Sequence, residues 1–508
     1  MTYGRVDRIG VAIGLLIASS ASAAAGSAET ATKDALARIE AIDPRINSVL
    51  AVDPTAIAQA RAIDGRRPAG PLAGRPILIK DNIEVAGPLP TTAGSLALRD
   101  NVTGRDAPLV AQLRAGGMVI LGKTNLSEWA NIRSKDSISG WSAVGGQTRN
   151  PYALGRNPCG SSSGSGAAVG AGIVDYAIGT ETNGSVTCPA SVNGIVGLKP
   201  SVGLVSRTHI VPISATQDTA GPMTRTVRQA AELLTAISGT DPADQSTAGA
   251  DARKIDYAAA LDAGSLKGKR LGLMRFASGF GTDQALEQAI ALLKSQGAEV
   301  VEIKELGGDD KGVKSLAVLL AELKNGLNAY LESTPAAVKT RSLADVIAFN
   351  KSNPRELALF DQALFEQAEA TKGLDEPGYR EALRAGLAYA GTNGIDRLLK
   401  ANRLDALIGP TVSPSWPIDA VNGDQYPGGG GGYLAAIAGY PHLTVPMGQV
   451  KGLPVGLSFI GTKWSDAMIL SLGYAYEQAR GPLPPPRFLP SIETSAEIAP
   501  LLARPVRR

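Results

Sequence analysis

The feature that most constrains this chain is a glycine- and serine-rich stretch, residues 159–200, which reads CGSSSGSGAAVGAGIVDYAIGTETNGSVTCPASVNGIVGLKP. It carries two serine-bearing turns, one at residues 161–163 and one at Ser185, and small residues join them. Glycine at this density indicates tight turns and a close approach of the backbone to another group. We therefore expect the rest of the chain to be arranged around these serines.

Composition excludes several kinds of site. A net charge of +3, with acidic and basic residues spread along 508 positions, leaves no basic cluster of the kind that a nucleic-acid surface needs. A histidine- or cysteine-rich metal centre is excluded, because the chain has only two histidines and two cysteines. These are His209, His442, Cys159 and Cys188. A carboxylate-based site stays open, although no spaced cluster indicates one, and we expect no metal and no cofactor. The cysteines flank the serine turns; we favour two buried free thiols, and a disulfide between them stays open.

The N-terminus has the pattern of a signal peptide. Arg5 and Arg8 precede an apolar run over residues 9–17, and small residues follow at 21–23. We expect residues 1–25 to be removed and the mature chain, 26–508, to be exported to the periplasm or secreted. A retained anchor or a misassigned start is the alternative. The run is short for a membrane span, and no other stretch has the pattern of one, so we expect no membrane association after removal.

A buried strand delivers the first candidate for a base. Residues 76–79 are an apolar run, and Lys80 ends it abruptly with a charge.

A second predicted strand, over residues 118–121, lies inside a match to the phosphate-loop pattern at 117–124. We reject nucleotide binding, because that loop needs flexible inner positions, and here they are Met-Val-Ile-Leu.

The serines need a base, and the chain offers two. A serine hydroxyl is a poor nucleophile until a base removes its proton. Residues 160–164 match G-x-S-x-G with Ser162 as the nucleophile, and His442 is the late histidine that could serve it. The other option is a lysine kept neutral by burial. We favour Lys80, because it ends an apolar strand.

The pattern along the chain alternates between strands and helices. Residues 315–400 are dominated by helical spacing, and we expect a helical layer inserted in an α/β body. Residues 428–432 are all glycine, a flexible loop that would be a gate if it lay near a cleft. Further strands are predicted at 176–180, 268–275, 299–304, 406–408, 443–445 and 455–459, and helices within 29–66 and at 106–115, 164–174, 226–238 and 283–296.

Several motifs together resemble the amidase signature family. Ser185 follows Ser161 by 24 residues, the family's spacing between its bridging and nucleophilic serines. The resemblance spans about residues 30 to 480, and it implies a single α/β/α domain with a mixed twisted sheet covered by helices. The other matching motifs are GTETNGS at 179–185, GLKP at 197–200, LGKTN at 121–125, DTAGP at 218–222 and GLPVGL at 452–457.

The resemblance implies a Ser-Ser-Lys triad that hydrolyses a carboxamide C–N bond through an acyl-enzyme. Ser185 would be the nucleophile, Ser161 the bridging serine and Lys80 the base. In the family an unusual cis peptide bond holds the bridging serine. Backbone donors of an oxyanion hole each contribute on the order of 3 kcal/mol to the transition state. Here those donors would be the N–H groups of Thr182, Asn183, Gly184 and Ser185.

Within the family the chain is most similar to the peptide amidases, which convert C-terminal peptide amides to the free acid and ammonia. The stretches 123–131, 136–142 and 202–207 carry this similarity. Two positions depart from the common family pattern: Asn183 stands where glycine is frequent, and Thr187 where arginine is frequent. Trp129 and Trp141 would either wall an acyl-side pocket or only pack, and Ser137 would face the substrate.

Other functions stay open. The chain could be a broader acylamidase, an esterase or a carbamate hydrolase. It could be an amidotransferase-like subunit in a tRNA-linked complex, although an export signal speaks against this. A catalytically silent exported binding protein is the remaining alternative. We expect a small-molecule or peptide amide as the partner and no nucleic acid. The oligomeric state is left open.

Overall fold

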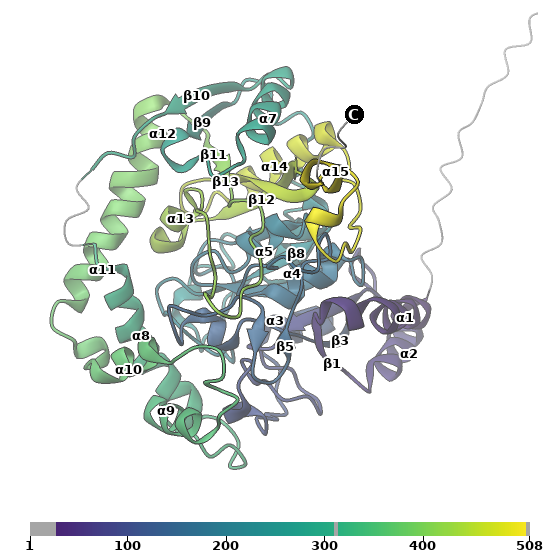
Figure 1. Ribbon diagram of the computed structural model, residues 1–508, viewed down its shortest axis with the longest axis vertical. Helices are drawn as coiled ribbons and strands as arrows, with labels where there is room; N and C mark the ends of the chain where they lie inside the picture. The colour runs from purple at the N-terminus through teal and green to yellow at the C-terminus, as the bar shows by residue number, and fades with distance from the viewer. Residues whose placement is uncertain (1–26, 309–312, 504–508) are drawn as a thin grey trace, which may run out of the picture.

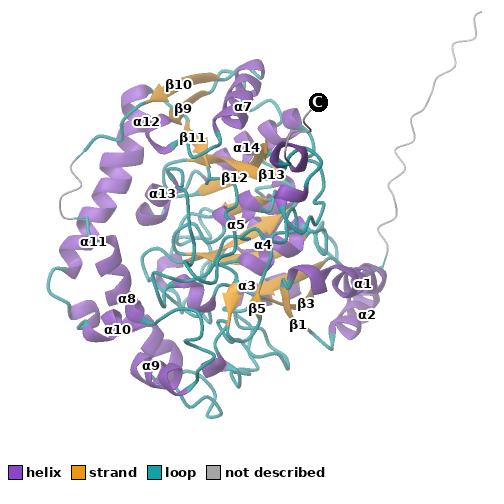
Figure 2. Cartoon of the chain, viewed as in Figure 1, coloured by secondary structure: helices purple, strands orange, loops and turns teal. Residues whose placement is uncertain are grey.

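An 11-stranded sheet runs through the molecule, with helices on both faces (Figures 1 and 2). The computed structural model describes residues 27–308 and 313–503, so the expected signal peptide lies outside the described residues. In spatial order the strands are β1 (Val49–Val52), β3 (Val119–Thr124), β2 (Pro76–Lys80), β6 (Tyr176–Glu181), β8 (Thr219–Thr224), β7 (Val196–Lys199), β12 (His442–Val450), β13 (Leu453–Ile460), β11 (Ala406–Pro410), β9 (Arg270–Met274) and β10 (Glu299–Ile303).

The sheet is mixed, as expected. Strand β2 is parallel to both β3 and β6, and β9 is parallel to β10 and β11. The central strands β8, β7, β12 and β13 pair with their neighbours in antiparallel fashion. A separate two-stranded ribbon consists of β4 (Trp141–Ser142) and β5 (Gly146–Gln147).

Two apolar clusters, one on each face of the sheet, hold the covering helices. The larger cluster packs α3 (Pro108–Ala115), α6 (Val227–Ile237), α7 (Asp283–Ser295) and α14 (Asp466–Arg480). The other packs α1 (Ala28–Ile46), α2 (Ala56–Arg66), α4 (Ser163–Gly170) and α5 (Thr187–Val192). Burial of apolar surface on both faces makes this the single α/β/α domain that the sequence predicts.

The helix-rich segment lies along one side of the sheet, at the left of Figure 1. Side chains of α8, α9 and α10 share one apolar cluster with the loop around Trp129. Two further helices, α13 (Gly432–Ala438) and α15 (Ala499–Leu502), follow later in the chain. The segment itself contains α8 (Ser315–Glu332), α9 (Leu343–Ser352), α10 (Ala363–Ala370), α11 (Tyr379–Leu387), a π-helical turn (Ala388–Asp396) and α12 (Arg397–Asn402).

Three strands of the 11-stranded sheet have no counterpart in the sequence-based expectation. They are β1, which lies between the two N-terminal helices, and β7 and β8, which lie between α5 and α6. Strand β8 reads TAGPMT, and its glycine and proline hide the usual strand signal. It is a strand because β6 and β7 flank it on both sides and satisfy its backbone.

The alternation of side chains in β2 decides where Lys80 lies. Ile77 and Ile79 belong to the larger apolar cluster, whereas Leu78 belongs to the cluster on the opposite face, with α4. Successive side chains of a strand point to opposite faces, so Lys80 follows Leu78 toward α4. Helix α4 begins at Ser163, directly after the first serine turn.

Candidate active site

Lys80 is fully buried at the carboxyl end of β2 and contacts the first serine turn. Its Nζ atom lies 2.7 Å from Ser161 Oγ. The same atom lies 2.8 Å from the hydroxyl of Thr180 and 3.2 Å from its carbonyl oxygen. Asn82 donates a hydrogen bond to the Thr180 hydroxyl at 3.0 Å. The lysine is therefore held by neutral groups only.

The protonation of Lys80 is set by its surroundings. Burial lowers the pKa of Lys80 to about 7, although the carboxylates of Asp218 and Glu181 act in the opposite direction. An amine with this pKa is partly unprotonated at neutral pH. It can accept a proton from Ser161, which an ordinary lysine cannot do in water at that pH.

In the first serine turn, Ser161 contacts Lys80, whereas the hydroxyl of Ser162 is hydrogen-bonded to the backbone. The Gly160–Ser161 peptide bond is cis. The N–H of Ser162 donates to the carbonyl of Ser185 at 3.1 Å, which brings the two serine turns into direct contact. The Ser162 hydroxyl donates to the carbonyl of Thr180 at 3.1 Å and accepts from its N–H at 3.2 Å. Ser162 thus braces the turn, and Ser161 is the serine that faces the lysine.

His442 is not placed to act as a base for Ser162. It lies in β12, and its Nε2 atom is 2.7 Å from Ser458 Oγ. Burial lowers the pKa of His442 to about 4, so the ring is neutral at pH 7. The G-x-S-x-G interpretation, which needs this histidine beside the serine, finds no support in the geometry.

The second serine turn presents free backbone donors. Within the described part of the chain, the N–H groups of Asn183, Gly184 and Ser185 donate no hydrogen bond. Gly184 has φ +83°, and a Cβ at this position would meet no atom within 4 Å. Three consecutive free N–H groups beside an open space are what an oxyanion hole requires. Ser185 itself is half-buried.

Two carboxylates hold the second serine turn in place through hydrogen bonds. Glu181 accepts hydrogen bonds from the N–H groups of Val186 and Thr187 at 2.8 and 3.0 Å, and so anchors the start of α5. Asp218 accepts a hydrogen bond from the Thr182 hydroxyl at 2.6 Å. The negative charges of both carboxylates also raise the pKa of Lys80, against the effect of burial. Sequence reasoning did not single out Asp218 as a functional residue, although it begins a family motif.

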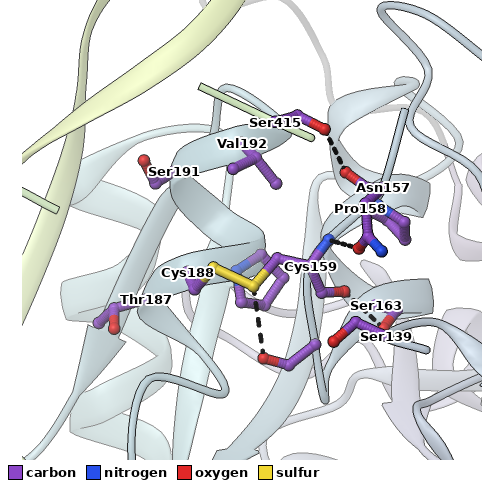
Figure 3. The surroundings of a disulfide bond; sticks show 12 residues. Ser139, Asn157, Pro158, Cys159, Ser163, Thr187, Cys188, Ser191, Val192 and Ser415 are labelled. Atoms are coloured by element: carbon purple, nitrogen blue, oxygen red, sulfur yellow. Dashed lines mark hydrogen bonds between the residues drawn. A yellow bond between two sulfur atoms is a disulfide. The ribbon is translucent and has the colours of Figure 1, made fainter. Parts of the chain in front are cut away.

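A disulfide joins the two serine turns (Figure 3). Cys159 and Cys188 are bonded, and the structure describes no free cysteine in the residues that it covers. The expectation of two buried free thiols was therefore wrong. The sequence places the cysteines beside the two serine turns, but only the fold shows that their Cα atoms lie 6.0 Å apart, within bonding reach. The bond lies between the residue before Gly160 and the first turn of α5.

Two cavities adjoin residues 180–184. The smaller has a volume of about 240 Å³, and Thr180, Thr182 and Asp218 are part of its wall. The larger has a volume of about 520 Å³, and its wall includes Gly160, the disulfide and residues 183–184. It also contains aromatic side chains that sequence reasoning missed: Phe276, Trp416, Tyr426 and Tyr433.

Comparison with known proteins agrees with this geometry. Residues 30–470 match the family described as Amidase. The chain belongs to the amidase family. It is 40% identical over 474 residues to a probable amidase of Arabidopsis thaliana, covering 89% of this chain and 87% of the relative. It is 36% identical to a glutamyl-tRNA(Gln) amidotransferase subunit from Roseiflexus castenholzii, covering 87% and 90% of the two chains.

Solved structures extend the comparison. The native peptide amidase from Stenotrophomonas maltophilia superimposes with a TM-score of 0.86 and 49% identity, covering 91% of this chain and 96% of that one. A peptide amidase in complex with the competitive inhibitor chymostatin gives a TM-score of 0.87 with the same identity and coverage. The protein is therefore an amide-hydrolysing enzyme with the fold of peptide amidase.

Three residues expected to contact substrate lie in other surroundings in this amidase. The ring of Trp129 packs against that of Phe365 with 5.6 Å between the ring centroids. The ring of Trp141 packs against that of Phe360 with a centroid distance of 5.2 Å. The Ser137 hydroxyl donates to the carbonyl of Ser134 at 2.9 Å. None of the three forms part of the wall of either cavity beside residues 180–184. Their described contacts are those of packing and loop-bracing residues.

The described residues offer neither a metal-ion cluster nor a membrane-spanning helix. Residues 27–308 and 313–503 contain no group of three His, Cys, Asp or Glu side chains placed to hold a metal ion. Over the same ranges no helix has both the length and the apolar character needed to span a bilayer.

Proposed function

We propose that this amidase cleaves the C-terminal amides of peptides to the free acid and ammonia, with Lys80, Ser161 and Ser185 as its catalytic triad. The observation that carries the proposal is the buried contact of 2.7 Å between Lys80 Nζ and Ser161 Oγ, directly beside the turn that bears Ser185. The likeness to solved peptide amidases, one of them bound to the competitive inhibitor chymostatin, supports this substrate class.

In the first half-reaction, neutral Lys80 takes the proton of Ser161 Oγ, and Ser161 in turn takes that of Ser185 Oγ. The Ser185 oxygen then attacks the amide carbonyl carbon. The negative charge that develops on the carbonyl oxygen is stabilised by the N–H groups of Asn183 and Gly184, together with those of Thr182 and Ser185. The relay returns a proton to the nitrogen, the C–N bond breaks, and ammonia leaves behind an ester on Ser185.

In the second half-reaction water replaces ammonia. A water molecule gives its proton to the same relay and attacks the ester carbonyl. The C–O bond to Ser185 breaks, the serine recovers its proton, and the acid leaves. No step needs a cofactor, because the two serines and the lysine carry every proton.

The experiment follows ammonia release from a peptide amide with the purified mature chain. Ser185→Ala is expected to lower kcat by at least about 10³-fold, since it removes the attacking oxygen. A covalent serine-directed probe should label the wild-type protein and not this variant. Turnover by Ser185→Ala at the wild-type rate would disprove the assignment of the nucleophile.

A second candidate is the amidotransferase role, which the 36% identity to an amidotransferase subunit favours. Its test uses the same assay. Ammonia release by the purified chain alone, with neither tRNA nor a second subunit, excludes a dependence on a complex. Relative rates on a peptide amide, an anilide and an ester then separate a peptide amidase from a broader acylamidase, esterase or carbamate hydrolase.

We also propose that the protein works outside the cytoplasm. The disulfide between Cys159 and Cys188 supports this, because disulfides persist in the periplasm and in secreted proteins and are rare in the cytosol. The N-terminal sequence of the protein recovered from cell fractions tests it. A protein that keeps residues 1–25 and stays with the cytosol would contradict it.

A further inference from the structure

One carboxylate in the wall of the larger cavity has no cationic partner. Among the described residues that line this cavity, Asp424 is the one acidic or basic residue apart from His442, which is neutral at pH 7. Among the ion pairs of the described residues, none includes Asp424. The residue is half-buried, and a charge partly removed from water is costly unless something compensates it.

The hydrogen bonds to Asp424 come from neutral donors. Oδ1 accepts from Asn157 Nδ2 at 2.7 Å and from the indole Nε1 of Trp416 at 3.2 Å. Oδ2 accepts from the backbone N–H of Ser139 at 3.1 Å. Burial raises the pKa of Asp424, and these donors act in the opposite direction by stabilising the ionised carboxylate. None of the donors carries a positive charge.

A short chain of contacts connects Asp424 to the first serine turn. Ser139, which donates to Asp424, is followed by Gly140, whose N–H donates to Ser127 Oγ at 2.8 Å. The N–H of Ser127 donates to the carbonyl of Ser161 at 3.0 Å. Asp424 and the turn that carries the bridging serine therefore belong to one braced unit, and Asp424 borders the same cavity as Gly160, the residue before that serine.

The rest of the cavity wall suits a cation. The rings of Trp416 and Tyr426 meet edge to face at a centroid distance of 5.2 Å, and Phe276 and Tyr433 also border the space. Aromatic faces attract ammonium and guanidinium groups, above all where water is partly excluded. A carboxylate among aromatic rings thus selects a positive charge over a neutral group of similar shape.

We propose that the larger cavity is a subsite for a cationic group in the acyl part of the substrate, with Asp424 as its anionic partner. This inference rests on the proposed function, because it assumes that the scissile amide lies at Ser185. The cation could be a free α-ammonium group or a basic side chain, and these two sources share the same chemistry.

Two matched pairs of dipeptide amides test the subsite with the wild-type protein. The first compares acetyl-arginyl-alanine amide with its citrulline analogue, which has nearly the same shape and no charge. The second compares leucyl-alanine amide with its N-acetyl form. In at least one pair, kcat/KM for the cationic member is expected to be about tenfold higher, mostly through KM. The pair that shows the preference identifies the source of the charge.

Asp424→Asn then assigns the preference to this carboxylate. The variant is expected to lose most of the tenfold preference, so that the two members of the pair are turned over with similar kcat/KM. Asp419→Asn is the matched control, because Asp419 lies in the same loop, is half-buried and borders neither cavity. It should keep the wild-type preference.

Three results would overturn the subsite. Equal kcat/KM within both pairs for the wild-type protein excludes a cation preference, whatever the variant does. An Asp424→Asn variant that slows both members of a pair equally shows that Asp424 only braces the loop. If the wild-type protein hydrolyses none of the four amides, the proposed function fails and the subsite with it; turnover without preference removes the subsite alone.

Discussion

With Lys80 as the base, the proposed mechanism predicts a pH dependence that follows from the burial of this lysine. The proposed relay needs the unprotonated amine, and burial lowers the pKa of Lys80 to about 7. We therefore expect kcat/KM to rise with pH through an apparent pKa near 7 and to level off above it. Initial rates of ammonia release between pH 5 and 9 measure this. A rate that falls as the pH rises through 7 would contradict a lysine base.

Asp218 allows a sharper test of the same assignment. Its negative charge raises the pKa of Lys80. Asp218→Asn removes that charge and should move the pH profile toward lower pH. Asp375→Asn, at an exposed position, is the control and should leave the profile in place. An unchanged apparent pKa in Asp218→Asn would mean that the titration seen in the profile belongs to another group.

The neighbouring serines should respond differently to substitution. Ser162→Ala removes the partner of the Thr180 N–H, so we expect a loss of about 1–3 kcal/mol in the free energy of unfolding, with turnover retained. Ser161→Ala should instead lower kcat by at least about 10²-fold, since it interrupts the relay. Urea unfolding and ammonia release separate the two effects. Loss of all turnover in Ser162→Ala, with the fold intact, would revive the G-x-S-x-G interpretation.

At the scale of elements, the disulfide ties the loop before α4 to the first turn of α5. It closes a segment of 29 residues that contains both serine turns. Reduction, or the double substitution of Cys159→Ser with Cys188→Ser, should lower the free energy of unfolding by about 3 kcal/mol. Turnover should also slow, because the two turns are then joined by the hydrogen bond between Ser162 and Ser185 without the covalent link. Urea unfolding with and without reductant measures the first effect; reductant should not change the double variant.

The sequence predicts elements wherever the local pattern is strong. The apolar run before Lys80 and the 24-residue spacing of the two serines are local signals, and the structure brings all the predicted strands into one sheet. Strand β8 has no such signal, because it depends on its neighbours. The sequence does not reveal the cavity wall either, because Gly160 and Trp416 are far apart in the chain and line one cavity only through the fold. The disulfide was missed for the same reason.

At the scale of the whole molecule, one glutamate connects the helix-rich segment to the sheet. Glu322 of α8 is buried and accepts hydrogen bonds from the Ser214 hydroxyl, from Thr216 and from the Tyr379 hydroxyl. The loop it contacts leads to Asp218 at the active site. Glu322 is thus one of several side chains that bond the helical layer to the rest of the molecule; Tyr330 and Glu356 are others.

Glu322→Ala should therefore destabilise the protein by about 3 kcal/mol or more, because several buried donors lose a charged acceptor at once. The exposed Glu381→Ala, on α11, is the control and should stay within about 0.5 kcal/mol of the wild-type value. Urea unfolding followed by circular dichroism measures both. Equal stability of the two variants would mean that the hydrogen bonds to Glu322 contribute little to the stability of the protein.

The position of β12 and β13 in the sheet has a consequence for how the protein is made. These strands, residues 442–460, lie between β7 and β11 and join two half-sheets that share no other strand pair in the described chain. Translation reaches them only after all the other strands of the sheet. Until then the nascent polypeptide has two unjoined halves, each with an unpaired edge. A premature stop between residues 410 and 442 would leave β7 and β11 as unpaired strand edges, so such fragments should aggregate rather than persist as smaller enzymes.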